Sequence, residues 1–259
     1  MNPLRPIGAA FLGFLAATGQ LTLFTVTSVS HCLRPPFFFR LLARQMIDIG
    51  YYSLPVVGMT TLFAGMALAL QTYSGFSRLS AEAESAIAKV VLLGITRELG
   101  PVLAGLMVAG RIGAAMAAEL GTMRVTEQID ALTTLSTNPY KYLVAPRIIA
   151  GLTMLPVLVF VGDIIGVFGG YIVSVYKLGF NPGLYIKGSW DILQFIDVIS
   201  GLVKAAAFGF IVTLMGCYHG YHSKGGAQGV GAATTNAVVS ASILILITNY
   251  IITEMFFST

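Results

Sequence analysis

Residues 94–147 read GITRELGPVLAGLMVAGRIGAAMAAELGTMRVTEQIDALTTLSTNPYKYLVAPR. The first half of this stretch, Gly94 to Leu120, is long enough to cross a bilayer as a helix. Four charged residues interrupt it: Arg97, Glu98, Arg111 and Glu119. Charges at membrane depth are costly, so they usually face protein or water and serve a function. The stretch therefore predicts a membrane span that carries chemistry.

Small residues recur at every fourth position of this span. They are Gly105, Ala109, Gly113 and Ala117, and a later span repeats the pattern at Gly162, Gly166 and Gly170. Such rows let another helix approach backbone to backbone. We expect both rows to be helix-packing faces.

The segment that follows, residues 122–138, is too short and too polar to span. The Thr122 hydroxyl can cap a new helix, and the Asn138-Pro139 pair can end it. An apolar stripe runs between them: Val125, Ile129 and Leu132. The pattern predicts an amphipathic helix at the membrane edge. From the residues alone, an ordinary interfacial helix and a partner-docking helix both remain open.

The run RELGPVLAGLMVAGRIGAAMAAELGTMRVTEQIDAL resembles the signature of MlaE-type permeases, the membrane subunits of bacterial lipid ABC transporters. The signature spans residues 94–140, and the later run GGAQGVGAATTNAVV extends the resemblance to most of the chain. The resemblance implies that 122–138 is a coupling helix seated in a groove of a partner ATPase. The residues expected to make this contact are Arg124, Glu127, Gln128 and Asp130.

The resemblance also implies an assembly in the bacterial inner membrane. Two copies of the chain would pack about a twofold axis around a cavity that opens toward the periplasm. The implied partners are an ABC ATPase that uses ATP and Mg²⁺, a lipid-binding MCE-domain protein and a STAS-domain accessory protein. Phospholipid is the implied cargo, with outer-membrane lipid asymmetry as the purpose. The chain itself is expected to bind no cofactor.

Composition agrees with a membrane protein. The 259 residues are 56% hydrophobic and only 10% charged, with a mean hydropathy of +0.83. No soluble domain of this size needs so much apolar surface. The net charge of +4 comes from scattered basic residues, so we expect no nucleic-acid partner. Cys32 and Cys217 lack metal-ligand spacing and are expected to be inert thiols.

Hydropathy predicts an all-α polytopic protein forming one domain over residues 1–259, with its transmembrane bundle at 49–257. Five spans are expected: Ile49–Leu70, Val90–Leu120, Ile148–Tyr176, Val198–Tyr218 and Asn236–Phe257. Basic residues gather in the segments that this layout places inside, which predicts a cytoplasmic N-terminus. Residues 1–48 would form an elbow helix along the inner face, as the resemblance implies. Alternatively, the apolar run 7–29 spans the membrane.

The sequence offers no enzyme chemistry. It lacks the G-x-x-x-x-G-K-[ST] pattern of a phosphate-binding loop, so ATP hydrolysis is assigned to the partner. Asp163 is expected to be hydrogen-bonded inside the bundle. A stand-alone secondary transporter, which would show two similar halves with broken helices, and a non-transporting scaffold are the alternative functions.

Arg97 and Glu98 are adjacent, so on a helix their side chains diverge by about 100°. Each is expected to meet another helix, with Lys204, Asn249 or Glu254 as the available partners. Two hypotheses stay open: static pairs that fix helix register, or a polar cluster beneath a lipid cavity. The resemblance favours the second. Members of that family often have Asp where this chain has Asn249, which puts a salt bridge from Lys204 to the fifth span in doubt.

An apolar cavity for acyl chains needs bulky side chains near the outer end of the first span. The candidates are Leu68, Leu70, Tyr73, Phe76 and Leu79. Aromatic residues at this depth also serve as plain interface anchors.

Overall fold

The computed structural model describes residues 4–32, 34–35, 38–76 and 83–258. No strand occurs among them, and five helical stretches are long and apolar enough to cross a membrane. These are Phe39–Gly75, Ala86–Val125, Tyr140–Lys177, Phe195–Tyr221 and Gly226–Phe257. The expected all-α protein with five membrane spans is confirmed. The expected boundaries were too narrow, because the helices continue into polar sequence beyond the apolar runs.

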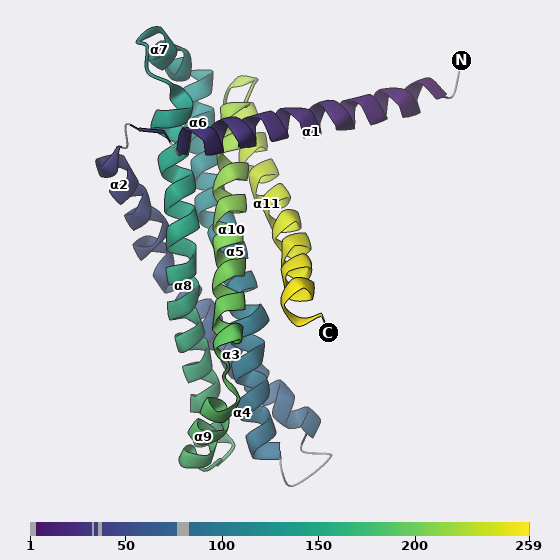
Figure 1. The fold of residues 1–259 in the computed structure, drawn as a ribbon, viewed down its shortest axis with the longest axis vertical. Helices are drawn as coiled ribbons and strands as arrows, with labels where there is room; N and C mark the ends of the chain where they lie inside the picture. Colours follow the sequence, from purple (N-terminus) through teal and green to yellow (C-terminus); the bar gives the residue numbers. More distant parts are fainter. Residues whose placement is uncertain (1–3, 33, 36–37, 77–82, 259) are drawn as a thin grey trace.

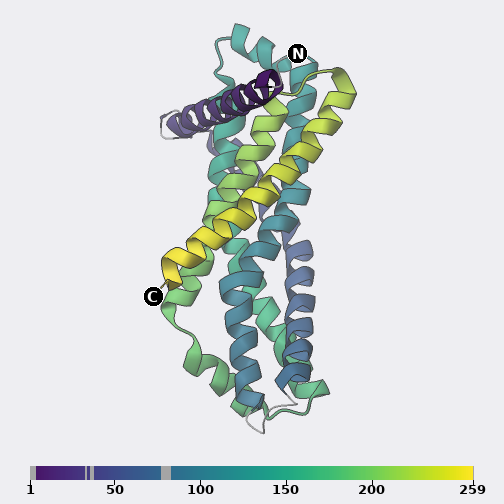
Figure 2. The same cartoon turned by 90° about the vertical axis from the view of Figure 1, so that its right-hand side faces the viewer.

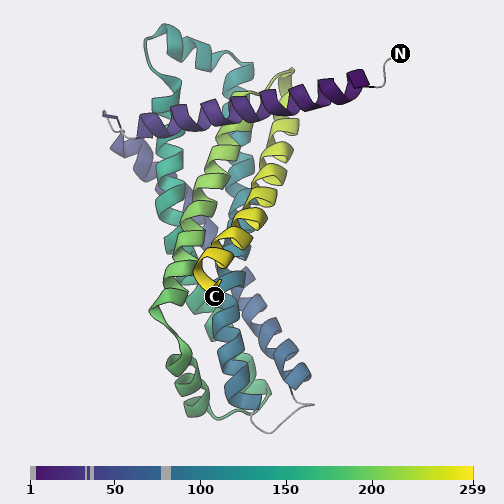
Figure 3. The ribbon, with the colours of Figure 1, turned by 45° about the vertical axis from the view of Figure 1, so that its right-hand side comes forward.

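The N-terminal region forms two helices, α1 (Leu4–Cys32) and α2 (Phe39–Ile49). A short 3₁₀ turn, Tyr51–Ser53, joins α2 to α3 (Leu54–Phe76). Helix α1 lies across the bundle close to its α7 end, whereas α2 continues along the bundle (Figures 1 and 3). This orientation of α1 suits a helix on the membrane surface. Its role as an elbow stays a prediction.

The second span is built from three helices in line, α4 (Ala83–Gly94), α5 (Gly100–Val108) and α6 (Ala114–Val125). Two π-helical turns join them, Ile95–Leu99 and Ala109–Gly113. Such single turns inside α-helices are frequent at functional sites. The first of them holds Arg97 and Glu98, and the second holds Arg111.

The rest of the chain alternates between the two ends of the bundle. The short α7 (Gln128–Thr134) lies at one end and α9 (Pro182–Ile192) at the other (Figure 1). Between them runs α8 (Ala145–Ile172), extended by π-helical turns at Tyr140–Val144 and Val173–Lys177. The last helices are α10 (Phe195–Tyr221) and α11 (Gly226–Phe257). Helix α11 is tilted against the others and ends part-way along the bundle (Figure 2).

The glycine rows are buried where helices touch. A Cβ atom on Gly166 would lie 3.1 Å from the Thr61 backbone oxygen of α3, and one on Gly170 would lie 2.5 Å from Val91. In the second span, a Cβ on Gly105 would meet the Phe208 ring of α10 at 3.1 Å. Ala109 and Ala117 are fully buried. These rows bring the helix backbones close together, and that fixes the relative positions of the spans that carry the polar side chains.

Candidate functional site

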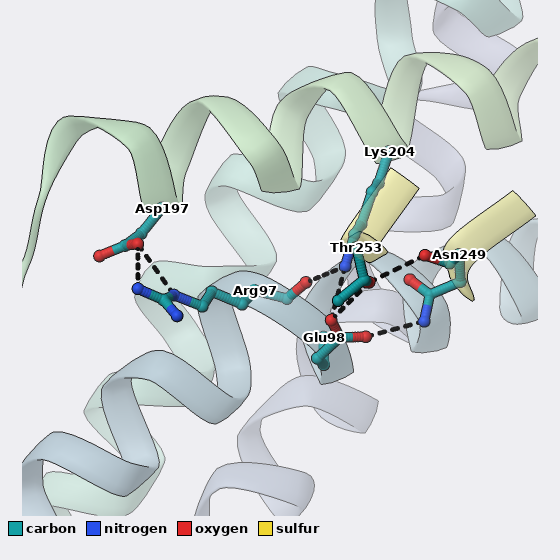
Figure 4. Close-up of polar contacts among 6 residues, drawn as sticks. All are labelled: Arg97, Glu98, Asp197, Lys204, Asn249 and Thr253. Atoms are coloured by element: carbon teal, nitrogen blue, oxygen red, sulfur yellow. Dashed lines mark hydrogen bonds and ion pairs between the residues drawn. The ribbon is translucent and has the colours of Figure 1, made fainter. Parts of the chain in front are cut away.

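A cluster of charged and polar side chains joins the second, fourth and fifth spans (Figure 4). Its centre is the π-helical turn that carries Arg97 and Glu98. Pro101 lies four residues after Arg97 and has no N–H, so the Arg97 carbonyl loses its usual helical donor. The Lys204 ammonium of α10 donates to this carbonyl at 2.7 Å. The backbone of the turn is therefore part of the cluster.

The first half of the cluster pairs Arg97 with Asp197. Two nitrogens of the Arg97 guanidinium contact the same oxygen of Asp197. Nε lies 2.8 Å and Nη2 lies 2.6 Å from Asp197 Oδ1. Asp197 is fully buried in the first turn of α10, where its other oxygen accepts from the Gln194 N–H at 3.0 Å. A carboxylate is favoured at a helix N-terminus. The Arg97 guanidinium also lies 4.1 Å from the centroid of the Phe257 ring.

The second half of the cluster is built around Glu98. Its carboxylate accepts from Lys204 Nζ at 2.7 Å, from Asn249 Nδ2 at 2.7 Å and from Thr253 Oγ1 at 2.8 Å. The expected partners Lys204 and Asn249 are confirmed. Glu254 was the wrong candidate: residues 249 and 253 share a helix face at i, i+4, whereas residue 254 is turned away.

Asp197 was missed as a partner because the sequence placed it in the external segment before α10. The capping contact to Gln194 instead draws it into the start of that helix. Lys204 forms its salt bridge with Glu98 and not with α11. Glu98 in turn accepts a hydrogen bond from Asn249 of α11, so Glu98 links the fourth span to the fifth. With Asn249 in this position, the fifth span contributes two hydrogen bonds to Glu98, from Asn249 and Thr253, and no charge to the cluster.

The cluster is neutral overall but unevenly exposed. The charges of its two cations and two carboxylates cancel formally. The α10 members of the two ion pairs, Asp197 and Lys204, have 0% side-chain exposure. Arg97 and Glu98 are 31% and 40% exposed. The accessible members of the cluster are therefore one guanidinium and one carboxylate, which point away from each other toward different partners (Figure 4).

Asp163 on α8 lacks the hydrogen bond that was expected for it. It lies in the bundle, but its Oδ1 is buried and has no hydrogen-bond partner within the described residues. The oxygen fills the space that a side chain on Gly100 would take, since a Cβ there would lie 1.8 Å from it. The expectation of a hydrogen bond to this oxygen was wrong, because the glycine supplies room and no side-chain donor.

The segment expected to be a coupling helix over 122–138 is shorter. Helix α6 runs on to Val125, and the Thr122 hydroxyl bonds back to the Ala118 carbonyl at 2.8 Å instead of capping a new helix. The chain turns at Glu127, whose φ is 58°, and α7 covers only Gln128–Thr134.

The polar residues expected to contact the ATPase lie on this turn. Arg124 and Asp130 form an exposed ion pair at 2.6 Å, which ties the end of α6 to α7. Gln128 Nε2 donates to the Thr126 hydroxyl at 3.0 Å, and Ile129 is buried beneath them. The turn is thus held in shape while its charged side faces outward. Its docking role stays a prediction.

The apolar candidates at the end of α3 pack into a small second core with α4 and α9. Leu68, Leu70 and Tyr73 are partly buried there, and the Tyr73 ring lies 5.9 Å from that of Phe180. The side chain of Phe76 and the whole of Leu79 lie outside the described residues. Whether this group lines a cavity depends on a second copy of the chain, so that assignment stays a prediction.

Comparison with known proteins decides the family. The family model described as Permease MlaE matches residues 42–255. The chain belongs to the MlaE permease family. The matched range contains α7 and every residue of the polar cluster except Phe257.

Individual relatives agree with this MlaE-family assignment. A Rickettsia felis protein named "Probable ABC transporter permease protein" is 59% identical over 257 residues, covering 99% of this chain and 98% of the relative. A Haemophilus influenzae protein named "Intermembrane phospholipid transport system permease protein MlaE" is 33% identical, covering 99% and 98%. A Synechocystis relative, also named an ABC transporter permease, is 38% identical, covering 98% and 91%. The chain is an ABC transporter permease of the MlaE family and a multi-pass membrane protein.

Proposed function

We propose that this chain is the permease subunit of a transporter that moves phospholipid between the inner membrane and periplasmic partners, and so helps to maintain outer-membrane lipid asymmetry. Two observations support this. The Haemophilus influenzae relative is named for intermembrane phospholipid transport. The polar cluster also offers an accessible guanidinium and carboxylate inside a largely apolar bundle.

The cluster carries the argument for lipid as the cargo. A phospholipid has an anionic phosphate and, in many cases, a cationic amine on one small headgroup. Arg97 can meet the phosphate through charge-assisted hydrogen bonds, and Glu98 can meet the amine. Fully buried Asp197 and Lys204 hold these two side chains in place. Because each carries its own counterion, Arg97 and Glu98 can stay charged at membrane depth between lipids.

The chain needs partners for this function. An ABC ATPase would dock at α7 and hydrolyse ATP with Mg²⁺, while the chain itself would carry no catalytic residue. A second copy would complete the cavity. An MCE-domain protein would receive or deliver the lipid, and a STAS-domain protein would be an accessory subunit. The transporter would reside in the bacterial inner membrane with the N-terminus in the cytoplasm.

Co-purification tests this function. The full-length chain, tagged and extracted from its own membranes in mild detergent, should bring down a soluble ATPase in equal molar amount. The purified complex should hydrolyse ATP faster when phospholipid is added. A secondary transporter or a scaffold would be isolated without an ATPase, and that result would contradict the proposal.

A further inference from the structure

A polar cavity lies apart from the cluster and shares no residue with it. It has a volume of 370 Å³ and lies between α2, the last turns of α6 and the start of α8. Six polar residues line it: Arg44, Gln45, Asp48, Glu119, Tyr142 and Arg147. Neither the proposed transport route nor the docking turn uses these side chains.

Arg147 forms the floor of this cavity and is only 4% exposed. Its Nη1 donates to the Leu143 carbonyl at 2.7 Å, and its Nη2 lies 2.8 Å from Glu119 Oε2. Its Nε is buried without a partner among the described residues. Its one counterion among the described residues, Glu119, is 58% exposed. A buried guanidinium with an unsatisfied donor and a mostly solvated counterion is incompletely neutralised, which is costly unless further polar groups approach it.

Two more charges line the cavity from α2. Arg44 and Asp48 are one helical turn apart, yet neither forms an ion pair with another described residue. The Arg111 guanidinium lies near Asp48, but it contacts the backbone and not the carboxylate. It donates to the Asp48 carbonyl at 3.1 Å and to the Ser53 hydroxyl at 2.7 Å. The Asp48 carboxylate is therefore left for another group. Together the cavity holds two guanidinium groups and two carboxylates, so its formal charge is zero.

The surroundings of the cavity indicate where a ligand comes from. The outer side of α2 and the turn after it expose the large apolar side chains of Phe39, Ile47 and Tyr51. Such a face suits contact with lipid. The cavity lies at the α7 end of the spans, since Glu119 and Met123 sit in the last two turns of α6. In the topology proposed above, this end of the spans faces the cytoplasm, where lipid headgroups meet water.

We propose that this cavity binds the headgroup of a membrane phospholipid that carries a primary amine. The phosphodiester would lie at Arg44, above the Arg147 guanidinium. The ammonium would lie between Asp48 and Glu119. A primary ammonium brings three hydrogen-bond donors to these carboxylates. A choline group brings none, and a glycerol headgroup brings no positive charge. The site is separate from the polar cluster and goes beyond the transport function proposed above.

Photocrosslinking in the intact complex tests the site. The photoreactive residue p-benzoylphenylalanine would replace Gln45, which lines the cavity, or Ala43, which is exposed on another side of α2. The complex would be placed in vesicles with equal parts of phosphatidylethanolamine, phosphatidylglycerol and phosphatidylcholine of the same acyl chains. Mass spectrometry would identify the adducts after irradiation. Position 43 reports the bulk lipid, so it is the matched control.

The expected result is an enrichment of phosphatidylethanolamine at position 45 of about tenfold over position 43, the ratio that one charge-assisted hydrogen bond provides. The Asp48→Asn change should reduce this enrichment to the level at position 43. It keeps the backbone carbonyl that Arg111 contacts, so the fold of α2 is preserved. The Arg40→Gln change, outside the cavity, should leave the enrichment intact.

Four outcomes would overturn the proposal. Equal lipid ratios at the two positions would show no headgroup preference, and enrichment of phosphatidylglycerol would show a purely basic site. Adducts to a protein chain at position 45 would show that the cavity is a protein contact. Full competition by soluble glycerophosphoethanolamine at millimolar concentration would identify a free phosphoester as the ligand instead of a lipid. None of these readouts depends on transport, so failure here and failure of the transport function are distinguishable.

Discussion

Replacing Glu98 by Leu leaves the Lys204 ammonium fully buried with the Arg97 carbonyl as its remaining hydrogen-bond partner in the described structure. Removing one partner of a buried ion pair costs about 3–5 kcal/mol, because the other charge stays uncompensated. Glu98 is 40% exposed, so water can partly replace it, and we expect the lower end, about 3 kcal/mol. The Thr253 hydroxyl still donates to the Asn249 carbonyl at 2.8 Å, so the loss of its bond to Glu98 adds little to the destabilisation.

Adding Lys204→Met to Glu98→Leu should restore most of the stability. The second change removes the buried charge together with its desolvation penalty, and such paired apolar replacements are often close to neutral. Replacing Arg97 and Glu98 together would not do this, because it would strand both Asp197 and Lys204, which belong to different pairs. The informative pair is therefore Glu98 with Lys204.

The assay combines stability and transport on the purified complex. Thermal unfolding should rank the variants with Glu98→Leu lowest and the double variant near the wild type. Lipid transfer from reconstituted vesicles should be lost in both variants, because the carboxylate that meets the headgroup is gone. Full transfer by the stable double variant would refute this reasoning and show that the charges only fix helix packing. A double variant no more stable than Glu98→Leu would refute the ion-pair energetics.

Three further predictions concern docking, topology and packing. Glu127→Lys on the turn before α7 should weaken ATPase binding without affecting membrane insertion, and unchanged binding with lipid-stimulated hydrolysis would exclude the docking role. A cysteine at Ser189 should react with a membrane-impermeant thiol reagent from the periplasm, whereas one at Thr137 should not; the reverse pattern would invert the topology. Gly209→Ala should destabilise the complex by about 1–3 kcal/mol, because the new Cβ would lie 2.1 Å from a backbone oxygen of α8. Gly110→Ala is the control: the space around Gly110 is open, so this change should leave the melting temperature unchanged in the same thermal scan.

Hydropathy and small-residue spacing predicted the number of spans and their packing faces, because both depend on local side-chain periodicity. The helix ends were less predictable. Thr122 has the side chain of a helix cap, but a hydroxyl can also bond back to the carbonyl four residues earlier. Inside α6 it does so. The choice between the two depends on where the chain next turns, and Glu127 sets that point with its positive φ.

The polar cluster was predicted in part. Arg97, Glu98, Lys204 and Asn249 stood out as polar residues inside apolar spans, and the cost of burying them predicted that they meet. That cost could not choose between Asn249 and Glu254 in the fifth span. Asp197 did not stand out, because it lies where an external segment gives way to α10 and only the capping contact to Gln194 places it in the helix. The role of Pro101 was readable from the sequence, since proline always frees the carbonyl four residues before it in a helix. That signal was overlooked.

The central claim is that this chain moves phospholipid when a partner ATPase hydrolyses ATP. The most direct measurement follows a fluorescent phospholipid between vesicles that contain the purified complex and a soluble lipid-binding acceptor. The account predicts transfer that requires both ATP and the ATPase subunit and that stops with the stable Glu98→Leu plus Lys204→Met variant. Transfer at the same rate without ATP, or with that variant, would contradict it.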